Sequence, residues 1–539
     1  MRRAPLFLAA LVAAAPAIAH ADTVRTWGGE DAPTTNTATS TGAPPPAPPV
    51  TIGTPAPGSS SASGEPPVTV GVVPGGVVRA AGTIGLKYTL EGIEVRGNRT
   101  TLSRVVLRYV PFSAGDVLDV NDPELQLTRF RLLGTGFFRT VQLSLRRGTQ
   151  RGYVVLVVDV AERNTIVVDD VWLGVSADVN SDGQAKPLTA FGGARVTETN
   201  LAGTGIGLGG AFAVADSQLG LRARIVDPQL GNSNWIAETE LLYNDARDFF
   251  GNNDVLVNGQ AQDYALVTYQ RFGGRLGLGH DLGISSQLLF NYRLERITAN
   301  VPLAASDYRG LDVEPIDFML PNGASILSTL SATIIHDTRD EQILPSRGHH
   351  LVASLDVGLT PLGSDYPYTK IVVRASQWFP LPWGHVLSLD AFAGGIFGDA
   401  PLFERFYVGD FSDLLPDRVL DLNFDRRPAP NYLSTDIVEI RYANYAFKLN
   451  AEYRIPIYRS RRSIYGVDLF GSFGVYGVAN GQDFTDPAPG YLGFSKLPID
   501  LTFNAGLRID TQAGGFVIGI ANLVGLAPVH GPEQGAARP

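Results

Sequence analysis

"YAFKLNAEYRIPI", residues 445–457, alternates between two kinds of side chain with a period of two. One face would carry only apolar side chains: Tyr445, Phe447, Leu449, Ala451, Tyr453, Ile455 and Ile457. The other face would carry mainly charged or polar side chains: Lys448, Asn450, Glu452 and Arg454. Successive side chains of a β-strand point to opposite faces of its sheet, so this stretch predicts a strand with one apolar and one polar face.

Two architectures explain such strands. A β-sandwich buries the apolar face and leaves the polar face in water. A transmembrane barrel turns the apolar face to lipid and the polar face to its lumen. Segments of ten or more residues, aromatic residues at segment ends (Trp378-Phe379, Trp383) and tight turns alternating with long polar loops such as 297–323 and 401–434 favour the barrel.

Residues 164–530 contain such segments throughout. We place fifteen candidate strands, beginning near residues 165, 188, 205, 218, 234, 261, 284, 325, 350, 368, 385, 437, 463, 499 and 515. Bacterial barrels normally have an even number of strands, so we expect a C-terminal antiparallel transmembrane β-barrel of about 16 strands in a mainly β protein.

The first residues have the features of an export signal. Arg2 and Arg3 precede an apolar run over 6–18, which ends at Ala19-His20-Ala21, and this pattern predicts a signal peptide over 1–21. Residues 22–86 are rich in Pro, Gly, Ser and Thr. Such a segment buries little apolar surface, so we expect a disordered linker.

Residues 87–163 predict one compact α+β domain before the barrel. Its expected elements, in the order β-α-α-β-β, are a strand over 90–95, helices over 102–109 and 121–134, and strands over 138–145 and 153–160.

Composition limits the function. The 539 residues include 43 Lys and Arg against 53 Asp and Glu, a formal net charge of −10, which argues against a nucleic-acid partner. Cysteine is absent, which excludes disulfides, thiol nucleophiles and cysteine metal ligands.

Several motifs resemble one family. Within the α+β domain, "IEVRGN" (93–98) and "LLGTGFF" (132–138) resemble a POTRA domain. In the barrel, "ETNLAGTG" (198–205), "HDTRDEQILPSRG" (336–348) and "FERFYVGD" (403–410) are similar to the BamA/TamA family of outer-membrane assembly and translocation barrels, whose relatives include two-partner-secretion transporters. The resemblance implies an outer-membrane barrel with the POTRA domain and the linker in the periplasm.

The resemblance also implies a site inside the barrel. "FERFYVGD" occupies the place of the family's VRGF/Y motif, on a long loop that folds back into the lumen. The expected loop residues are Phe403, Glu404, Arg405, Phe406, Tyr407 and Gly409. Arg405 is expected to pair with Glu452. A second family acid is replaced here by Ser472, with Asp468 nearby in the sequence.

The closing segment differs from the family pattern. Family members usually end on a strand with a terminal aromatic residue, whereas here the last apolar segment, 514–529, is followed by the polar tail 531–539.

The POTRA domain is expected to capture extended or unfolded polypeptide clients by lending them a sheet edge. The candidate edge residues are Leu90, Ile93, Val95, Phe138, Val141 and Leu143. Further expected partners are outer-membrane lipid and accessory periplasmic proteins or lipoproteins.

Three motifs of enzymes and metal sites find no support in their context. The G-x-G-x-x-G at 205–210 is followed by strands, not by the helix that dinucleotide binding needs. The D-x-N-x-D-G at 178–183 begins like a calcium loop but has Thr189 in place of the bidentate Glu. His349-His350 lacks a third ligand. We expect no enzyme, no metal and no cofactor.

Two alternatives to polypeptide insertion or translocation stay open, a passive porin-like channel and a specialised two-partner-type secretion pore. A barrel enzyme is the least supported reading, because no Ser-centred hydrolase motif is found.

Overall fold

The structure is a computed structural model. It describes residues 87–120, 122–179, 183–251, 255–283, 285–309, 312–340, 344–411, 418–426, 442–460, 464–484, 499–511 and 514–524. The predicted signal peptide, the predicted linker and the predicted polar tail lie outside the described residues.

The helices and strands are, in chain order, β1 (Lys87–Arg96), α1 (Ser103–Leu107), β2 (Val117–Asp119), α2 (Pro123–Gly134), β3 (Phe138–Arg147), β4 (Tyr153–Glu162), β5 (Ile166–Val179), β6 (Ala185–Glu198), β7 (Gly207–Ala215), β8 (Gln218–Asp227), β9 (Trp235–Phe250), β10 (Val255–Val257), β11 (Gln260–Gln262), β12 (Ala265–Asp281), β13 (Ser286–Asn300), β14 (Ala305–Arg309), β15 (Asp312–Pro315), β16 (Gly323–Asp337), β17 (Gly348–Gly358), β18 (Tyr368–Pro380), β19 (Val386–Gly398), β20 (Phe406–Tyr407), β21 (Arg418–Val419), β22 (Leu422–Asn423), β23 (Tyr442–Ala443), β24 (Tyr445–Arg459), β25 (Ile464–Ala479), β26 (Ile499–Thr511) and β27 (Gly514–Val524).

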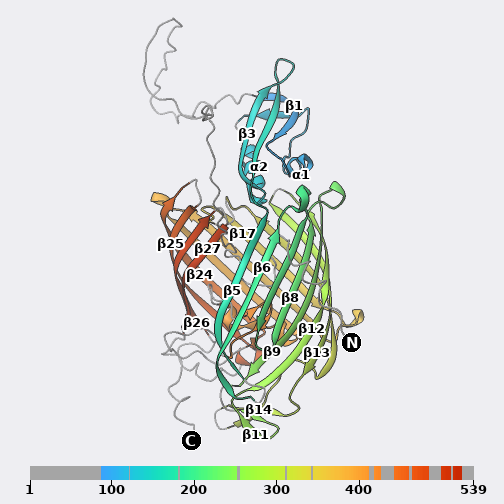
Figure 1. Ribbon diagram of the computed structural model, residues 1–539, viewed down its shortest axis with the longest axis vertical. Helices are drawn as coiled ribbons and strands as arrows, with labels where there is room; N and C mark the ends of the chain where they lie inside the picture. Colours follow the sequence, from blue (N-terminus) through green and yellow to red (C-terminus); the bar gives the residue numbers. More distant parts are fainter. Residues whose placement is uncertain are drawn as a thin grey trace, which may run out of the picture.

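The first six elements form an α+β unit at one end of the molecule (Figure 1). Its sheet has the order β2-β1-β4-β3. Helix α2 begins where the sequence predicts, because Asp122 accepts a hydrogen bond from the N–H of Glu124 and Pro123 suits the first helical position. The short strand β2 was not predicted. Among the described residues no helix is long and apolar enough to cross a membrane.

Fifteen antiparallel strands then form one curved sheet that wraps into a barrel (Figure 1). Its order is β27-β26-β25-β24-β19-β18-β17-β16-β13-β12-β9-β8-β7-β6-β5. Fourteen of these strands begin within four residues of the predicted positions, and β24 begins at Tyr445, not near 437. We expected about 16 strands; within the described part of the chain the sheet has fifteen, with β5 and β27 at its two ends.

The two faces of this sheet differ as the alternation predicts. On β24, Leu449 and Tyr453 are 55% and 41% exposed on the outer surface, whereas Glu452 and Arg454 are buried inside the barrel. The apolar residues therefore do not form the packed interior between two sheets that a sandwich requires. The sandwich interpretation is wrong because the apolar face points away from the barrel axis.

The two ends of the barrel differ in their connections. Among the connections at the end nearest the α+β unit is the short turn 381–385. The far end has longer connections and carries the separate sheet β11-β10-β14-β15 (Figure 1). Of the aromatic residues expected at the membrane interface, Trp383 is 87% exposed, but Trp378 is buried on the lumen side, where Arg339 lies over its ring.

The "ETNLAGTG" turn after β6 holds the α+β unit against the barrel. Leu102 N–H donates to Gly203 O (2.9 Å) and Asn200 Nδ2 donates to Thr101 Oγ1 (2.8 Å). Gly203 has φ +74°, and a Cβ there would lie 1.9 Å from the carbonyl oxygen of Thr100. Glycine is therefore required both by backbone conformation and by the close approach of the two units.

A second contact joins α1 to the barrel wall. Arg108, at the C-cap of α1, lies 2.7 Å from the carboxylate of Asp281, the last residue of β12. Both side chains are more than three-quarters buried, so the pair fixes the orientation of the α+β unit over the barrel.

Candidate functional site: the loop inside the barrel

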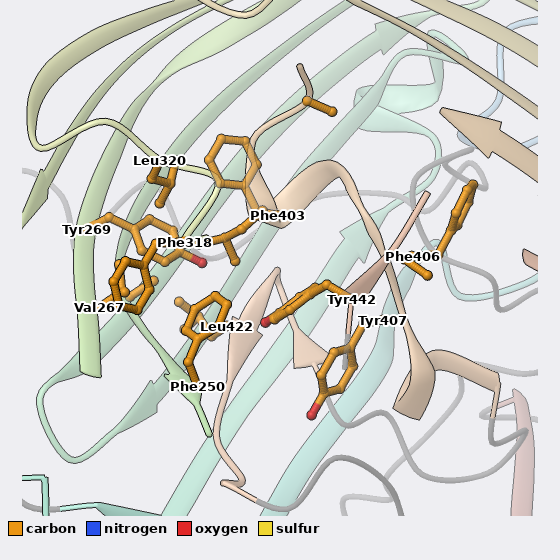
Figure 2. Close-up of a cluster of buried hydrophobic side chains, with 14 of the residues drawn as sticks. Phe250, Val267, Tyr269, Phe318, Leu320, Phe403, Phe406, Tyr407, Leu422 and Tyr442 are labelled. Atoms are coloured by element: carbon orange, nitrogen blue, oxygen red, sulfur yellow. The ribbon is translucent and has the colours of Figure 1, made fainter. Parts of the chain in front are cut away.

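The loop between β19 and β24 enters the barrel, as the resemblance implies. Its described parts are 399–411, 418–426 and 442–444. Phe403, Phe406 and Tyr407 are each at most 7% exposed. Figure 2 shows them in one cluster with Tyr442 of the same loop and with side chains of the barrel wall. The aromatic residues of "FERFYVGD" are thus the loop's contribution to an apolar core inside the lumen.

Short strand pairs give the loop its shape. β20 pairs with β23, and β21 pairs with β22. The turn of the second hairpin is Leu420–Asp421, with φ of +51° and +64°. Two successive left-handed residues form the tight turn of a two-residue hairpin, and such a conformation is costly for residues other than glycine. The contacts that Leu420 and Asp421 make with the barrel wall compensate for the conformational cost of this turn.

The hairpin tip binds the barrel wall at Asp421. Its carboxylate pairs with Arg222 of β8 and lies 3.1 Å from Nη1 of Arg271 on β12. The backbone oxygen of Leu420 accepts from Asn244 Nδ2 (2.8 Å). Arg271 is 1% exposed, and its guanidinium also makes two hydrogen bonds to Glu295 (2.9 and 3.3 Å).

Glu404 makes the second attachment. Its Oε1 lies 2.6 Å from Nη1 of Arg293 on β13, and its Oε2 lies 3.2 Å from Nζ of Lys370 on β18. The neighbouring Phe403 ring packs under the guanidinium of Arg271 at 3.9 Å. A buried carboxylate needs cationic partners, and here the wall supplies two.

The expected pair of Arg405 and Glu452 is not formed. Arg405 Nε donates to the backbone oxygen of Ala400 at 3.4 Å. Glu452 instead binds Arg508 of β26 through two hydrogen bonds (2.6 and 3.2 Å), with Arg454 Nε at 3.7 Å. The prediction of that pair is therefore wrong in this structure, because two closer arginines of the wall already neutralise Glu452.

The other two residues expected near Arg405 also have partners in the wall. Ser472 Oγ accepts from Asn504 Nδ2 (2.7 Å), and Asp468 lies 2.5 Å from Arg459 and 4.0 Å from Arg454. Together with Glu452 they belong to a polar network across β24, β25 and β26 at the lumen face.

The sequence analysis also missed a loop residue, Arg418, and a wall residue, Asp248. Arg418 pairs with Asp410 within the loop and lies over the ring of Tyr407 (5.2 Å). Asp248 of β9 is 1% exposed and accepts hydrogen bonds from Tyr442, from Asn423 (3.0 Å) and from Tyr269. The sequence marked Asp248 only as an inward-facing acid near the end of a predicted strand, and this was the one feature that could have pointed to its role.

The proposed client edge of the α+β unit is only partly as expected. Leu90, Phe138 and Val141 are at most 2% exposed, and Ile93, Val95 and Leu143 pack against the same core. β2 pairs with Lys87–Thr89 and makes that end of β1 an inner strand, whereas the predicted edge residues Leu90, Ile93 and Val95 lie beyond this pairing. β3 is an edge strand, as expected.

The motifs of metal and nucleotide sites have structural roles. His349 faces outward and His350 is buried on the lumen side, so the two rings cannot bind one ion. In the described part of the chain no group of three or more His, Cys, Asp or Glu side chains has the arrangement of a metal site. Gly207 and Gly210 belong to strand β7, which is not followed by a helix.

Comparisons with known proteins agree with this architecture. The Omp85 superfamily domain matches residues 200–414. The curated outer membrane protein assembly factor BamA of Nitratidesulfovibrio vulgaris is 24% identical over 335 residues, which are 61% of this chain and 37% of that protein. The chain thus aligns with little more than a third of that relative.

Among solved structures, CdiB from Escherichia coli shares the fold with a TM-score of 0.50 and 14% identity, over 82% of this chain and 74% of that chain. BamA from Haemophilus ducreyi lacking POTRA domains 1–3 gives a TM-score of 0.44 at 15% identity, over 81% of each chain. These comparisons show that the chain contains an Omp85 superfamily domain over residues 200–414 and is similar to BamA over 61% of its length.

Proposed function

We propose that this protein is an outer-membrane barrel that assists the insertion or translocation of polypeptides. In this proposal residues 87–163 act as a POTRA domain in the periplasm, and they collect extended segments before those segments reach the barrel. The role is non-enzymatic and needs no cofactor.

The observation that supports a polypeptide client over small solutes is the loop that packs inside the lumen. The charged space between the loop and the wall, lined by Arg271, Arg293, Lys370, Glu404 and Asp421, has a volume of only about 30 Å³. Aromatic residues of the loop pack beside it (Figure 2). A passive porin needs an open aqueous channel, so the loop position argues against a porin-like function.

The edge of β3 supports the capture step. An edge strand offers backbone N–H and C=O groups that an extended chain can pair with. Gln142 and Ser144 project from β3 on the exposed face of the sheet. One acceptor of β3 is already in use, because Arg129 Nε on α2 donates to Val141 O at 3.0 Å.

A second candidate is a specialised secretion pore of the two-partner type. The fold shared with CdiB over 82% of this chain supports that candidate. In that case the client would be one secreted polypeptide, and a general set of barrel proteins would not depend on this chain.

Photocrosslinking at the β3 edge tests the proposal. A photoreactive residue at Gln142 or Ser144 of the full chain is irradiated with a synthetic peptide of residues 499–511, an alternating barrel strand. We expect crosslinks at both positions and few at Asp159 of the inner strand β4. Equal labelling at Asp159, or none at β3, would contradict capture by the edge.

A further inference from the structure

The outer face of the barrel has a groove that crosses β17, β18, β19, β24 and β25. Its volume is about 780 Å³, within the range of pockets that bind ligands in proteins. The floor consists of small residues, since Ala375 lies directly opposite Ala391 and Ala451 lies opposite both Leu389 and Phe473. Larger exposed side chains border this floor: Leu351, Leu389, Leu449 and Phe473.

The groove runs obliquely from the end of the barrel nearest the α+β unit towards its middle. His349, at one end of the groove, is the second residue of β17, whose start lies at the α+β-unit end. Phe473, at the other end, lies near the middle of β25. Because strands of a barrel tilt, neighbouring residues across the sheet lie at successively different depths. The groove therefore connects a membrane interface with the hydrocarbon region.

The interface end of the groove is polar. The His349 and His336 rings stack at 4.8 Å. Their Nδ1 atoms are held by hydroxyl groups, His349 by Thr338 (3.1 Å) and His336 by Ser286 (2.7 Å), which leaves the two Nε2 atoms for a ligand. The side chain of Arg347, on the turn before β17, is 72% exposed, and its Nε lies 3.7 Å from the carboxylate of Asp340.

The rest of the groove offers only hydrocarbon. Its lining on β19, β24 and β25 consists, on the outer face, of leucine, alanine, valine and phenylalanine side chains. A ligand with an acidic headgroup and long apolar chains would match the polar end and the apolar remainder of the groove. Imidazole N–H and guanidinium groups bind phosphate oxygens, and the apolar floor accepts acyl chains.

We propose that this groove binds one anionic phospholipid of the membrane leaflet on the α+β-unit side. The phosphate lies at His336, His349 and Arg347, and the acyl chains lie over Ala375, Ala391 and Ala451. This inference depends on the barrel spanning a membrane and is independent of the nature of the client.

Native mass spectrometry of the full chain in detergent, with added phosphatidylglycerol or phosphatidylcholine, tests the site. We expect one phosphatidylglycerol to stay bound under activation that removes phosphatidylcholine. Ala391→Phe fills the groove and should lower the retained lipid about tenfold. Ala375→Leu, a smaller change, should lower it less. The matched control is Ala223→Phe, since Ala223 opposes Leu241 on the outer face of β8, away from the groove.

The headgroup contact is tested by the double variant His336→Gln and His349→Gln, which should lose the preference for phosphatidylglycerol while keeping a bound lipid. Excess inorganic phosphate should not displace the lipid. Retention unchanged in Ala391→Phe, or lost equally in Ala223→Phe, would overturn the proposal. A mass increase that matches covalent acylation of the protein, and not a bound phospholipid, would also overturn the proposal. Heat-modifiable gel mobility confirms that each variant is folded.

Discussion

Glu404 Oε1 lies 2.6 Å from Nη1 of Arg293, and this contact joins the loop inside the barrel to a wall strand 111 positions earlier in the chain. The loop supplies the acid and the wall supplies the cation. The resemblance implied the opposite polarity, with an arginine of the loop bound to an acid of the wall. The same polarity recurs at Asp421, which binds Arg222 and Arg271.

Glu404→Ala should destabilise the barrel by about 3–5 kcal/mol, because Lys370 loses the carboxylate that pairs with it and Arg293 keeps only that of Glu295. Arg405→Ala is the matched neighbour and should cost about 1 kcal/mol, since Arg405 makes one long hydrogen bond. Urea unfolding in lipid or detergent measures both. Equal losses in the two variants would show that the acid does not fix the loop.

Removal of the two loop acids that bind the wall, Glu404 and Asp421, should open the lumen. In the double variant Glu404→Ala and Asp421→Ala the loop loses its ion pairs to β8, β12, β13 and β18, so part of it should leave the barrel. Planar-bilayer recordings should then show larger and more frequent conducting events than the wild type. Glu314→Ala, which removes an acid from the far-end sheet, should leave conductance unchanged. A wild type already as conductive as the double variant would contradict a filled lumen.

Gly203→Ala should detach the α+β unit from the barrel. The added Cβ would lie 1.9 Å from Thr100 O, in addition to the strain of φ +74°. Gly231→Ala is a matched control, because Gly231 has φ +64° in a neighbouring turn but nothing within 4 Å of its Cβ position. Hydrogen exchange of the Leu102 amide, which bonds to Gly203 O, should rise in the first variant only. A similar rise in both variants would mean that backbone strain alone is responsible.

Glu162 makes the α+β unit sensitive to acid. Partial burial acts to raise the pKa of Glu162, but hydrogen bonds from the N–H groups of Thr101 and Thr100 outweigh it, so the pKa lies below its ordinary value of 4.5. The stabilisation is present above that ordinary value and is lost as the pH falls through the lower folded-state pKa. The protection factors of the Thr100 and Thr101 amides in hydrogen exchange should therefore decrease as the pH falls below the ordinary value of 4.5. Glu162→Gln should remove this pH dependence, and a wild type without it would contradict the assignment.

Arg129→Ala should increase capture at the β3 edge. The side chain of Arg129 occupies Val141 O, and an incoming strand would have to displace it. Crosslinking of the 499–511 peptide at Gln142 should rise in this variant. Arg139→Ala removes an exposed arginine from strand β3 itself and controls for the loss of one positive charge. An equal rise in both variants would indicate a charge effect and not release of the edge.

The barrel could be predicted from the sequence because its strands alternate apart from a few bulges. At Leu449 and Tyr453 against Glu452 and Arg454 the side chains divide between lipid and lumen, and each strand shows this division in its own residues. Strand β2 could not be predicted, since three residues carry too little periodicity and its pairing with β1 depends on the folded unit.

The contacts inside the lumen were less accessible to sequence reasoning. The resemblance at "FERFYVGD" implied a loop inside the lumen, and Phe403, Phe406 and Tyr407 are buried there. The partner of each charge, however, depends on strand register and on how deep the loop enters. Glu452 lies within reach of Arg508 because β24, β25 and β26 are adjacent, and this proximity across 56 positions is not visible in the local pattern.

Depletion of this protein in its own cells tests the central claim most directly, when combined with quantitative mass spectrometry of outer-membrane and secreted proteins and with a small-solute uptake assay. The account predicts that barrel proteins of the outer membrane, or one secreted polypeptide, fall in amount before solute uptake changes. Unchanged membrane and secreted proteins together with reduced solute uptake would contradict it.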